Sequence, residues 1–288
     1  MCSLVSNLNH NYIQTNGIKL HYVSQGEGSL MLMLHGFPEF WYSWRHQIVK
    51  FSENYCVVAP DLRGYNDSDK PQGKQCYQVT QLIQDIRGII TGLGYKKCIL
   101  VGHDWGGALA WHFADQYPEM LDQLIVLNIP HPAKFSQGLF TPQQLMRSWY
   151  IFFFQIPYLP EFWCRWNDYQ MIASAFTKMA IDSSAFSSRD IQAYREAAAK
   201  PGALTAAINY YRCIFRGLFN SQKSWRKIAV PTLMIWGEND TALGKELTYG
   251  TADYVENFTI KYIPNCSHWV QQEKPQLVNQ YISDFLSC

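Results

Sequence analysis

Short apolar runs alternate along the chain with segments whose apolar residues recur at helical spacing. Continuous apolar runs of four to six residues are typical of strands that are buried on both faces of a parallel sheet. We predict six such strands, at residues 30–34, 56–59, 98–101, 124–129, 232–236 and 259–263. Residues 18–23 instead alternate between apolar and polar side chains, which predicts a strand at the edge of the sheet.

Helical patterns lie between these strands, at residues 80–91, 108–117 and 275–286. The alternation of strand and helix predicts an α/β protein with a mostly parallel sheet and helices on both faces. It stops between about residues 133 and 226, where the pattern is helical without a clear strand. We therefore predict a core of residues 1–132 and 227–288, interrupted by a helical insertion of residues 133–226.

Aromatic residues are unusually frequent in this insertion. They make up 15% of the chain, with 10 Trp, 18 Tyr and 16 Phe. Residues 134–226 hold 20 of them, and the other 195 residues hold 24. Because ligand pockets are lined mainly by apolar and aromatic side chains, we expect the insertion to line a lipophilic cavity.

Charge and composition exclude several classes of function. Lys and Arg number 24 against 23 Asp and Glu, so the chain lacks the basic excess of a nucleic-acid-binding protein and suits a neutral substrate. There is no H-E-x-x-H segment and no Cys/His cluster at ligand spacing, and Gly92-Leu-Gly94 is a lone G-x-G. We expect no metal, no cofactor and no nucleic acid.

The ends of the chain and its cysteines bear on location. Residues 1–17 have neither the basic start nor the apolar run of a signal peptide, and no apolar run approaches a membrane span. The eight cysteines form no C-x-x-C pair, so we expect free thiols in a reducing, cytoplasmic setting. Peripheral association with a membrane and the choice between monomer and homodimer stay open.

The segment Gly102-His103-Asp104-Trp105-Gly106-Gly107 follows a predicted strand and precedes a helix. A G-x-nucleophile-x-G turn at such a junction forces its central residue onto a sharp bend, and hydrolases of this type usually carry Ser there. Here the central residue is Asp104, and the plain alternative is that it caps the following helix. A carboxylate is ionised at neutral pH, so it can displace a leaving group from an sp3 carbon and form an alkyl ester.

Hydrolysis of that ester needs a water molecule activated by a base. The expected chain order is nucleophile, acid, His, and Asp104, Asp240 and His268 follow three predicted strands in that order. Asp240 is preferred to Glu238 because it lies farther into its loop, and it would orient the imidazole of His268. The acid can also follow the strand that precedes the insertion. That position reads Asn128-Ile-Pro130-His131-Pro132 here and offers no carboxylate.

His35-Gly36-Phe37-Pro38 follows the strand at 30–34. It suits one half of an oxyanion hole, in which the backbone N–H groups of Phe37 and Trp105 converge on the ester oxygen. The same two residues are expected to contact the substrate. A simple turn before Pro38 is the alternative for this segment.

Taken together these segments resemble the epoxide hydrolases of the α/β-hydrolase fold, most closely the animal enzymes that lack an N-terminal phosphatase domain. The resemblance runs from Ile18 to the last helix and rests on HGFPEFWYSWR at 35–45, DLRGYNDSDKP at 61–71, GHDWGG at 102–107, GEND at 237–240 and SHW at 267–269. The resemblance implies a helical cap over the core and a role in lipid metabolism or detoxification. The chain departs from the family at Asn66, where Gly is usual, but Asn tolerates a left-handed backbone.

The resemblance also implies two catalytic tyrosines that the spacing alone does not give. In the family, two cap tyrosines bind the epoxide oxygen and protonate it. The F-Q-x-P and N-x-Y-R segments of this chain place them at Tyr150 and Tyr211. A Tyr hydroxyl, with a usual pKa near 10, can donate that proton without being charged at rest.

Two other functions fit part of this pattern. A haloalkane or haloacid dehalogenase would share Asp104 and use Trp105 at the halide, without needing the tyrosine pair. A non-catalytic receptor would keep the pocket alone, and the complete set of Asp104, Asp240 and His268 argues against it. A Ser esterase is disfavoured because no Ser occupies the turn.

Overall fold

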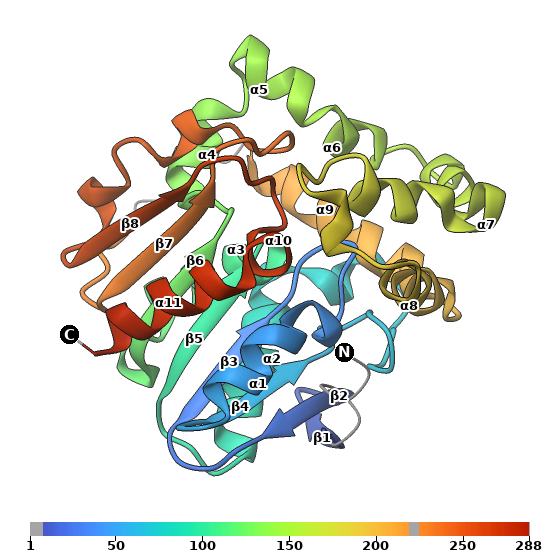
Figure 1. Cartoon of the computed structure of the whole chain (residues 1–288). Helices are drawn as coiled ribbons and strands as arrows, with labels where there is room; N and C mark the ends of the chain where they lie inside the picture. The colour runs from blue at the N-terminus through green and yellow to red at the C-terminus, as the bar shows by residue number, and fades with distance from the viewer. Residues whose placement is uncertain (1–7, 219–224, 288) are drawn as a thin grey trace.

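The computed structural model describes residues 8–218 and 225–287 and contains an eight-stranded sheet. Its strands run in the spatial order β1-β2-β4-β3-β5-β6-β7-β8 (Figure 1). Strands β3 to β8 are parallel, and β1 and β2 extend the sheet in antiparallel pairing. Their bounds are β1 Asn9–Thr15, β2 Ile18–Gln25, β3 Leu30–Leu34, β4 Cys56–Pro60, β5 Cys98–His103, β6 Leu121–Leu127, β7 Thr232–Gly237 and β8 Phe258–Ile263.

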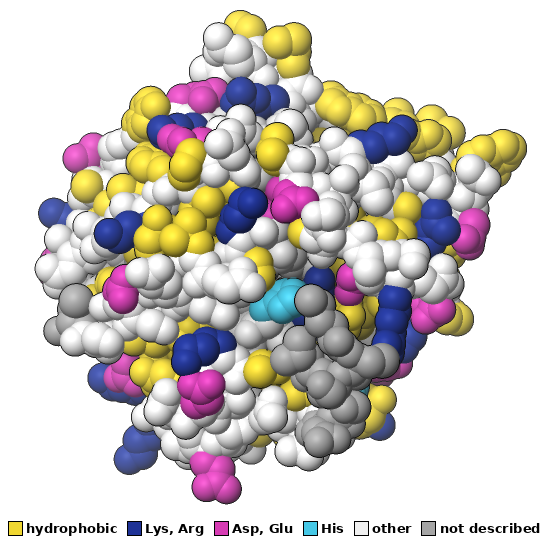
Figure 2. Space-filling model, in the orientation of Figure 1, with side chains coloured by type: hydrophobic (Ala, Val, Ile, Leu, Met, Phe, Trp, Pro, Cys, Tyr) yellow, Lys and Arg dark blue, Asp and Glu magenta, His cyan; other side chains and the backbone are white. Residues whose placement is uncertain are grey.

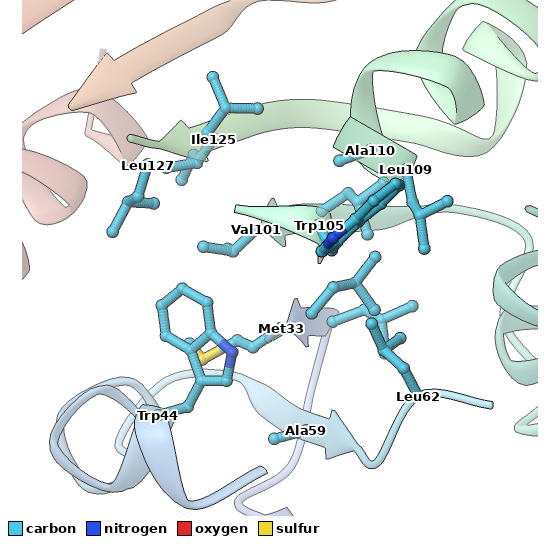
Figure 3. Close-up of a cluster of buried hydrophobic side chains, with 14 of the residues drawn as sticks. Met33, Trp44, Ala59, Leu62, Val101, Trp105, Leu109, Ala110, Ile125 and Leu127 are labelled. Atoms are coloured by element: carbon cyan, nitrogen blue, oxygen red, sulfur yellow. The ribbon is translucent and has the colours of Figure 1, made fainter. Parts of the chain in front are cut away.

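Helices cover both faces of the sheet, which confirms the predicted α/β class. One face carries α2 (Val79–Gly92) and α3 (Trp105–Gln116). The other carries α1 (Arg45–Phe51), α10 (Val270–Glu273) and α11 (Pro275–Leu286). Because the inner strands are covered on both sides, every side chain of β3 and β5 is buried. Figure 3 shows part of this core, where side chains of β3, β5 and β6 lie between Trp44 and the first turns of α3.

Three details of the sheet differ from the prediction. Residues 18–23 were expected to form an edge strand, but β2 lies between β1 and β4. Strand β1 was missed because its side chains are exposed or half-buried, so it has no apolar pattern. Strand β6 runs from Leu121 to Leu127, so it begins three residues and ends two residues earlier than predicted. Asn128, with a φ of 44°, follows its last residue.

The described residues between β6 and β7 form six α-helices, and Figure 1 shows them along one end of the sheet. They are α4 (Pro132–Gly138), α5 (Pro142–Arg147), α6 (Trp149–Phe153), α7 (Leu159–Thr177), α8 (Ser188–Ala199) and α9 (Ala203–Leu218). The helical backbone of α7 is interrupted at residues 166–169. No strand occurs among the described residues of 133–226; residues 219–224 of the predicted insertion, and residues 1–7 and 288 of the predicted core, lie outside the described part.

Parallel strands bring their carboxyl ends to one edge of a sheet, and the loops after β3, β5, β7 and β8 therefore meet there. The helices of the insertion lie over this edge (Figure 1). Within residues 8–218 and 225–287, no helix has the length and apolar character needed to cross a membrane.

Candidate active site

Asp104 occupies the turn between β5 and α3. Its φ of 47° and ψ of −118° are rarely adopted by residues with a side chain, and such strained residues cluster at functional sites. The turn packs tightly, because a Cβ on Gly106 would lie 2.1 Å from the carbonyl oxygen of Leu34. Asp104 precedes α3 but makes no side-chain capping hydrogen bond, so the helix-cap alternative has no support. Its side chain lines a cavity instead.

The two carboxylate oxygens of Asp104 have different neighbours. The N–H of Phe37 donates to Oδ1 at 2.8 Å, and Nε2 of His268 lies 3.6 Å from Oδ2. Burial alone would raise the pKa of Asp104, but the hydrogen bond and charge of His268, together with the charge of His103, lower it. Asp104 is therefore ionised at neutral pH. Within the described residues, the Trp105 N–H makes no hydrogen bond to this carboxylate.

His268 follows β8 and Asp240 follows β7, so the two loops meet at the carboxyl edge. Nδ1 of His268 lies 2.7 Å from Oδ2 of Asp240. The other oxygen, Oδ1, accepts hydrogen bonds from the N–H groups of Ala242 and Leu243 at 2.7 and 2.9 Å. Burial opposes the charged form of His268, but the carboxylates of Asp240 and Asp104 raise its pKa well above the ordinary value.

Glu238, the less favoured candidate for the acid, points elsewhere and forms an ion pair with Lys245. Asn128 completes the support of Asp240 and was not among the predicted site residues. It donates from Nδ2 to Oδ2 of Asp240 at 2.7 Å and accepts the N–H of Gly237 at 2.9 Å. The prediction considered only carboxylates at this position, and the amide of Asn128 instead orients the carboxylate of Asp240 in the loop after β7.

A second missed feature is a buried pair beneath the site. Nδ1 of His103 lies 2.7 Å from Glu39, and its Nε2 lies 2.8 Å from the carbonyl oxygen of His268. Burial would raise the pKa of Glu39, but His103 lowers it. Through these two contacts His103, one residue before Asp104 in the chain, connects Glu39 to the backbone of His268.

The predicted tyrosines come from two helices of the insertion, Tyr150 from α6 and Tyr211 from α9. With Asp104 and His268 they line a cavity of about 650 Å³. Their ring centroids lie 5.8 Å apart, with the ring planes nearly perpendicular. Burial and the charge of Asp104 raise the pKa of both hydroxyls, so both are protonated at neutral pH.

Hydrogen bonds connect the two segments that carry these tyrosines. Nε2 of Gln155 donates to the backbone carbonyl of Tyr211 at 3.2 Å. Arg212 donates to the carbonyl of Phe154 at 3.0 Å and forms two hydrogen bonds with Glu161, at 2.7 and 3.1 Å. These bonds fix α6 against α9, so the two hydroxyls are held in one arrangement.

Two pockets meet at Asp104. The larger is mostly apolar, with Trp149, Trp163, Met171 and Met179 in its wall. A smaller pocket of about 60 Å³ shares Asp104, Tyr150 and Tyr211 with it and is lined mainly by apolar side chains, among them Ala108, Ile129, Phe135, Ile151, Ile214 and Leu243.

One cluster in the described part of the chain has the geometry of a metal site. His21, Asp61 and Asp67 place possible ligand atoms within 4.8 Å of one another. Their polar atoms already have protein partners: His21 and Asp61 are 2.7 Å apart, and Asp67 pairs with Lys200. Asn66 donates to Asp61 at 2.8 Å with a φ of 38°, so it keeps the left-handed turn expected of the usual Gly. The cluster is explained as loop support.

Comparisons with known proteins agree with this geometry. Residues 29–275 match a family model described as the alpha/beta hydrolase fold. The chain is 44% identical over 282 residues to human "Epoxide hydrolase 4", which covers 95% of this chain and 77% of that protein. The chain belongs to the epoxide hydrolases of the α/β-hydrolase fold.

Other epoxide hydrolases are similar in sequence and structure. "Epoxide hydrolase 1" of Caenorhabditis elegans is 43% identical, over 96% of this chain and 70% of its own length. A crystal structure of a Bacillus megaterium epoxide hydrolase in complex with an inhibitor superimposes with a TM-score of 0.90 at 37% identity, covering 96% of this chain and 100% of that one. These relatives favour epoxide hydrolysis over the dehalogenase and receptor alternatives.

Proposed function

We propose that this epoxide hydrolase adds water to lipophilic epoxides and releases vicinal diols through an alkyl ester of Asp104. The observation that carries the proposal is the convergence of an ionised carboxylate, a His–Asp pair and two protonated tyrosines on one apolar cavity. Residues 133–226 are proposed as the cap that supplies the tyrosines, and residues 1–132 and 227–288 as the core.

Ring opening is the first step. Oδ1 of Asp104 is held by Phe37, so Oδ2 is the oxygen free to attack an oxirane carbon. The carbon–oxygen bond of the epoxide breaks as the ester bond forms, and the departing alkoxide needs a proton. Tyr150 and Tyr211 hold the epoxide oxygen and donate that proton, which makes the oxygen a better leaving group.

Ester hydrolysis is the second step. Esterification removes the charge of Asp104, which is one of the two carboxylate charges that raise the pKa of His268. The pKa of His268 then falls, and its Nε2 proton passes to the tyrosinate that ring opening leaves behind. The neutral ring accepts a proton at Nε2 from water, which attacks the ester carbonyl carbon. Oδ1 becomes the oxyanion, already bonded to the Phe37 N–H, and we propose that the Trp105 N–H joins it at that stage. Collapse of this intermediate breaks the bond between the carboxyl carbon and Oδ2, and Oδ2 leaves on the diol with the proton from His268. The carboxyl group of Asp104 then returns its proton to His268.

Isotope labelling tests the covalent step. In a single turnover in H2 18O with enzyme in excess, the diol should contain no 18O, because its new oxygen comes from Oδ2 of Asp104. Direct attack of water on the epoxide would instead label the diol in the first turnover, and this result would overturn the mechanism. Asp104→Ala should form no diol, and His268→Gln should accumulate an alkyl-enzyme whose mass exceeds that of the protein by the mass of the substrate.

A further inference from the structure

The first half of α7 presents an apolar stripe to solvent. Leu159, Phe162 and Trp163 have the spacing i, i+3 and i+4, which places them on one face of a helix. Trp166 begins the interruption of α7, and its ring centroid lies 5.7 Å from that of Phe162. The exposed fractions of these four residues lie between 42% and 65%. A helix that packs on a core buries such a face, so much of this one is left open to solvent.

The stripe continues onto the neighbouring helices. Trp149 is 51% exposed and its ring centroid lies 6.1 Å from that of Trp163, and Met146 at the end of α5 is 72% exposed. We call these six residues, Met146, Trp149, Leu159, Phe162, Trp163 and Trp166, the α6–α7 face. Figure 2 shows hydrophobic side chains gathered along the upper right edge, over α6 and α7. Contiguous apolar surface of this kind marks an interaction site.

The α6–α7 face adjoins the active-site cavity. Met146, Trp149 and Trp163 belong to the face and also line the cavity of Asp104. A partner that covers the face therefore lies next to this cavity.

The charges around the face are unbalanced. Each carboxylate of residues 140–182 has a basic partner: Glu161 pairs with Arg212, Asp168 with Arg195 and Asp182 with Lys274. Two cations of the same segment, Arg165 and Lys178, have no ion pair or side-chain hydrogen bond in the described chain. Arg165 lies between Trp163 and Trp166, and Lys178 lies at the cavity. The surface therefore suits an anionic partner.

We propose that the α6–α7 face docks on the surface of an anionic lipid bilayer. Exposed Trp and Phe with adjacent basic residues are typical of segments that lie in a membrane interface. A second copy of the chain would also cover the face but would bring no substrate to the adjoining cavity. A bilayer would instead supply lipophilic epoxide directly to the cavity, an advantage that rests on the proposed function.

Vesicle sedimentation tests the docking with the whole protein. We expect wild type to bind vesicles of phosphatidylcholine containing about 30% phosphatidylserine, and to bind them more weakly at high salt. The double variant Phe162→Ser/Trp166→Ser should lose at least about tenfold in partition coefficient, equivalent to about 1.4 kcal/mol. The matched control Tyr12→Ser/Tyr249→Ser, which removes two equally exposed rings outside the face, should bind as wild type does. Arg165→Gln should weaken binding to these vesicles more than to pure phosphatidylcholine.

Two further measurements separate docking from catalysis. Asp104→Ala should bind vesicles normally, so the docking result does not depend on turnover. The Phe162→Ser/Trp166→Ser variant should turn over a water-soluble epoxide such as styrene oxide at the wild-type rate. Equal vesicle binding by this variant and by wild type, or no binding by either, would overturn the proposal. A wild-type dimer that this variant converts to monomer, without vesicle binding, would assign the face to a second copy.

Discussion

Asp240→Asn is the substitution for which the structure makes the most detailed prediction. Oδ1 of Asp240 is fixed by the N–H groups of Ala242 and Leu243, and Oδ2 faces His268 at 2.7 Å. After substitution, the single amide oxygen can satisfy the two backbone donors only if the amide nitrogen takes the position of Oδ2, where it also meets the Nδ2 donor of Asn128. This arrangement opposes one donor, whereas the flipped amide would oppose two. The amide nitrogen then donates to Nδ1 of His268 and forces the ring proton onto Nε2, which can no longer accept a proton from water.

The charge lost at this position is large. Two unit charges 2.7 Å apart at an effective dielectric constant of about 20 interact by about 6 kcal/mol before desolvation is subtracted. Loss of the charge and of the correct tautomer in a Ser-His-Asp triad slows catalysis by about 10⁴-fold. We expect ester hydrolysis to slow by about 10³- to 10⁴-fold, or about 4–5.5 kcal/mol on the barrier. Asp104 keeps its geometry, so we expect ester formation to stay within about tenfold of wild type.

Rapid quenching followed by mass spectrometry of the intact protein measures the two steps separately. Asp240→Asn should show a burst of alkyl-enzyme equal to the enzyme concentration and then slow release of diol. Glu238→Gln is the matched control, because Glu238 lies in the same loop but pairs with Lys245, and it should turn over normally. If Asp240→Asn hydrolysed the ester within tenfold of the wild-type rate, the assignment of Asp240 as the partner of His268 would be refuted.

Four further predictions concern other parts of the site. Gly36→Ala would place a Cβ 2.4 Å from the Cβ of Asp104, so we expect at least about a 100-fold loss of kcat with an unchanged circular dichroism spectrum; near-normal kcat would contradict this. Arg212→Met leaves Glu161 without its partner and should lower the free energy of unfolding in urea by about 3 kcal/mol, whereas an unchanged midpoint would show that the pair is not needed. The raised pKa of His268 contributes stability that is fully present below its unfolded pKa of 6.5 and is lost as pH rises through its folded pKa, so the Tm advantage of wild type over His268→Gln should shrink on the alkaline side. The lowered pKa of Asp104 keeps it ionised, so ester formation in quenched single turnovers should be constant down to about pH 5, while ester hydrolysis rises with pH.

The inner strands of the sheet could be predicted because burial on both faces requires a continuous run of apolar residues. Leu30–Leu34 was predicted with its observed bounds, since all five side chains are apolar and buried. The outer strand β1 could not be, because its side chains are only partly covered and carry no alternation. Helix α1, with seven residues, is too short for a periodic signal.

Chain order predicted Asp104, Asp240 and His268, because the loops that follow parallel strands all lie at the carboxyl edge of the sheet. The supporting residues could not be predicted in the same way. Asn128 acts through a contact with Asp240, 112 positions away in sequence, and Glu39 reaches His103 across 64 positions. Such pairings depend on side-chain directions within a packed core, and neither residue type indicates by itself that it orients another.

The proton on His268 connects the two proposed half-reactions, ester formation at Asp104 and hydrolysis of that ester. In the resting site His268 lies between two carboxylates, 2.7 Å from Asp240 and 3.6 Å from Asp104. The interaction that lowers the pKa of Asp104 also raises that of His268, so the nucleophile is ionised while the base is blocked by its proton. In the proposed mechanism, ester formation removes the charge of Asp104 and lowers the pKa of His268, so the ring can give up its proton and activate water. The proposed covalent step would thereby convert His268 into a base for the second step.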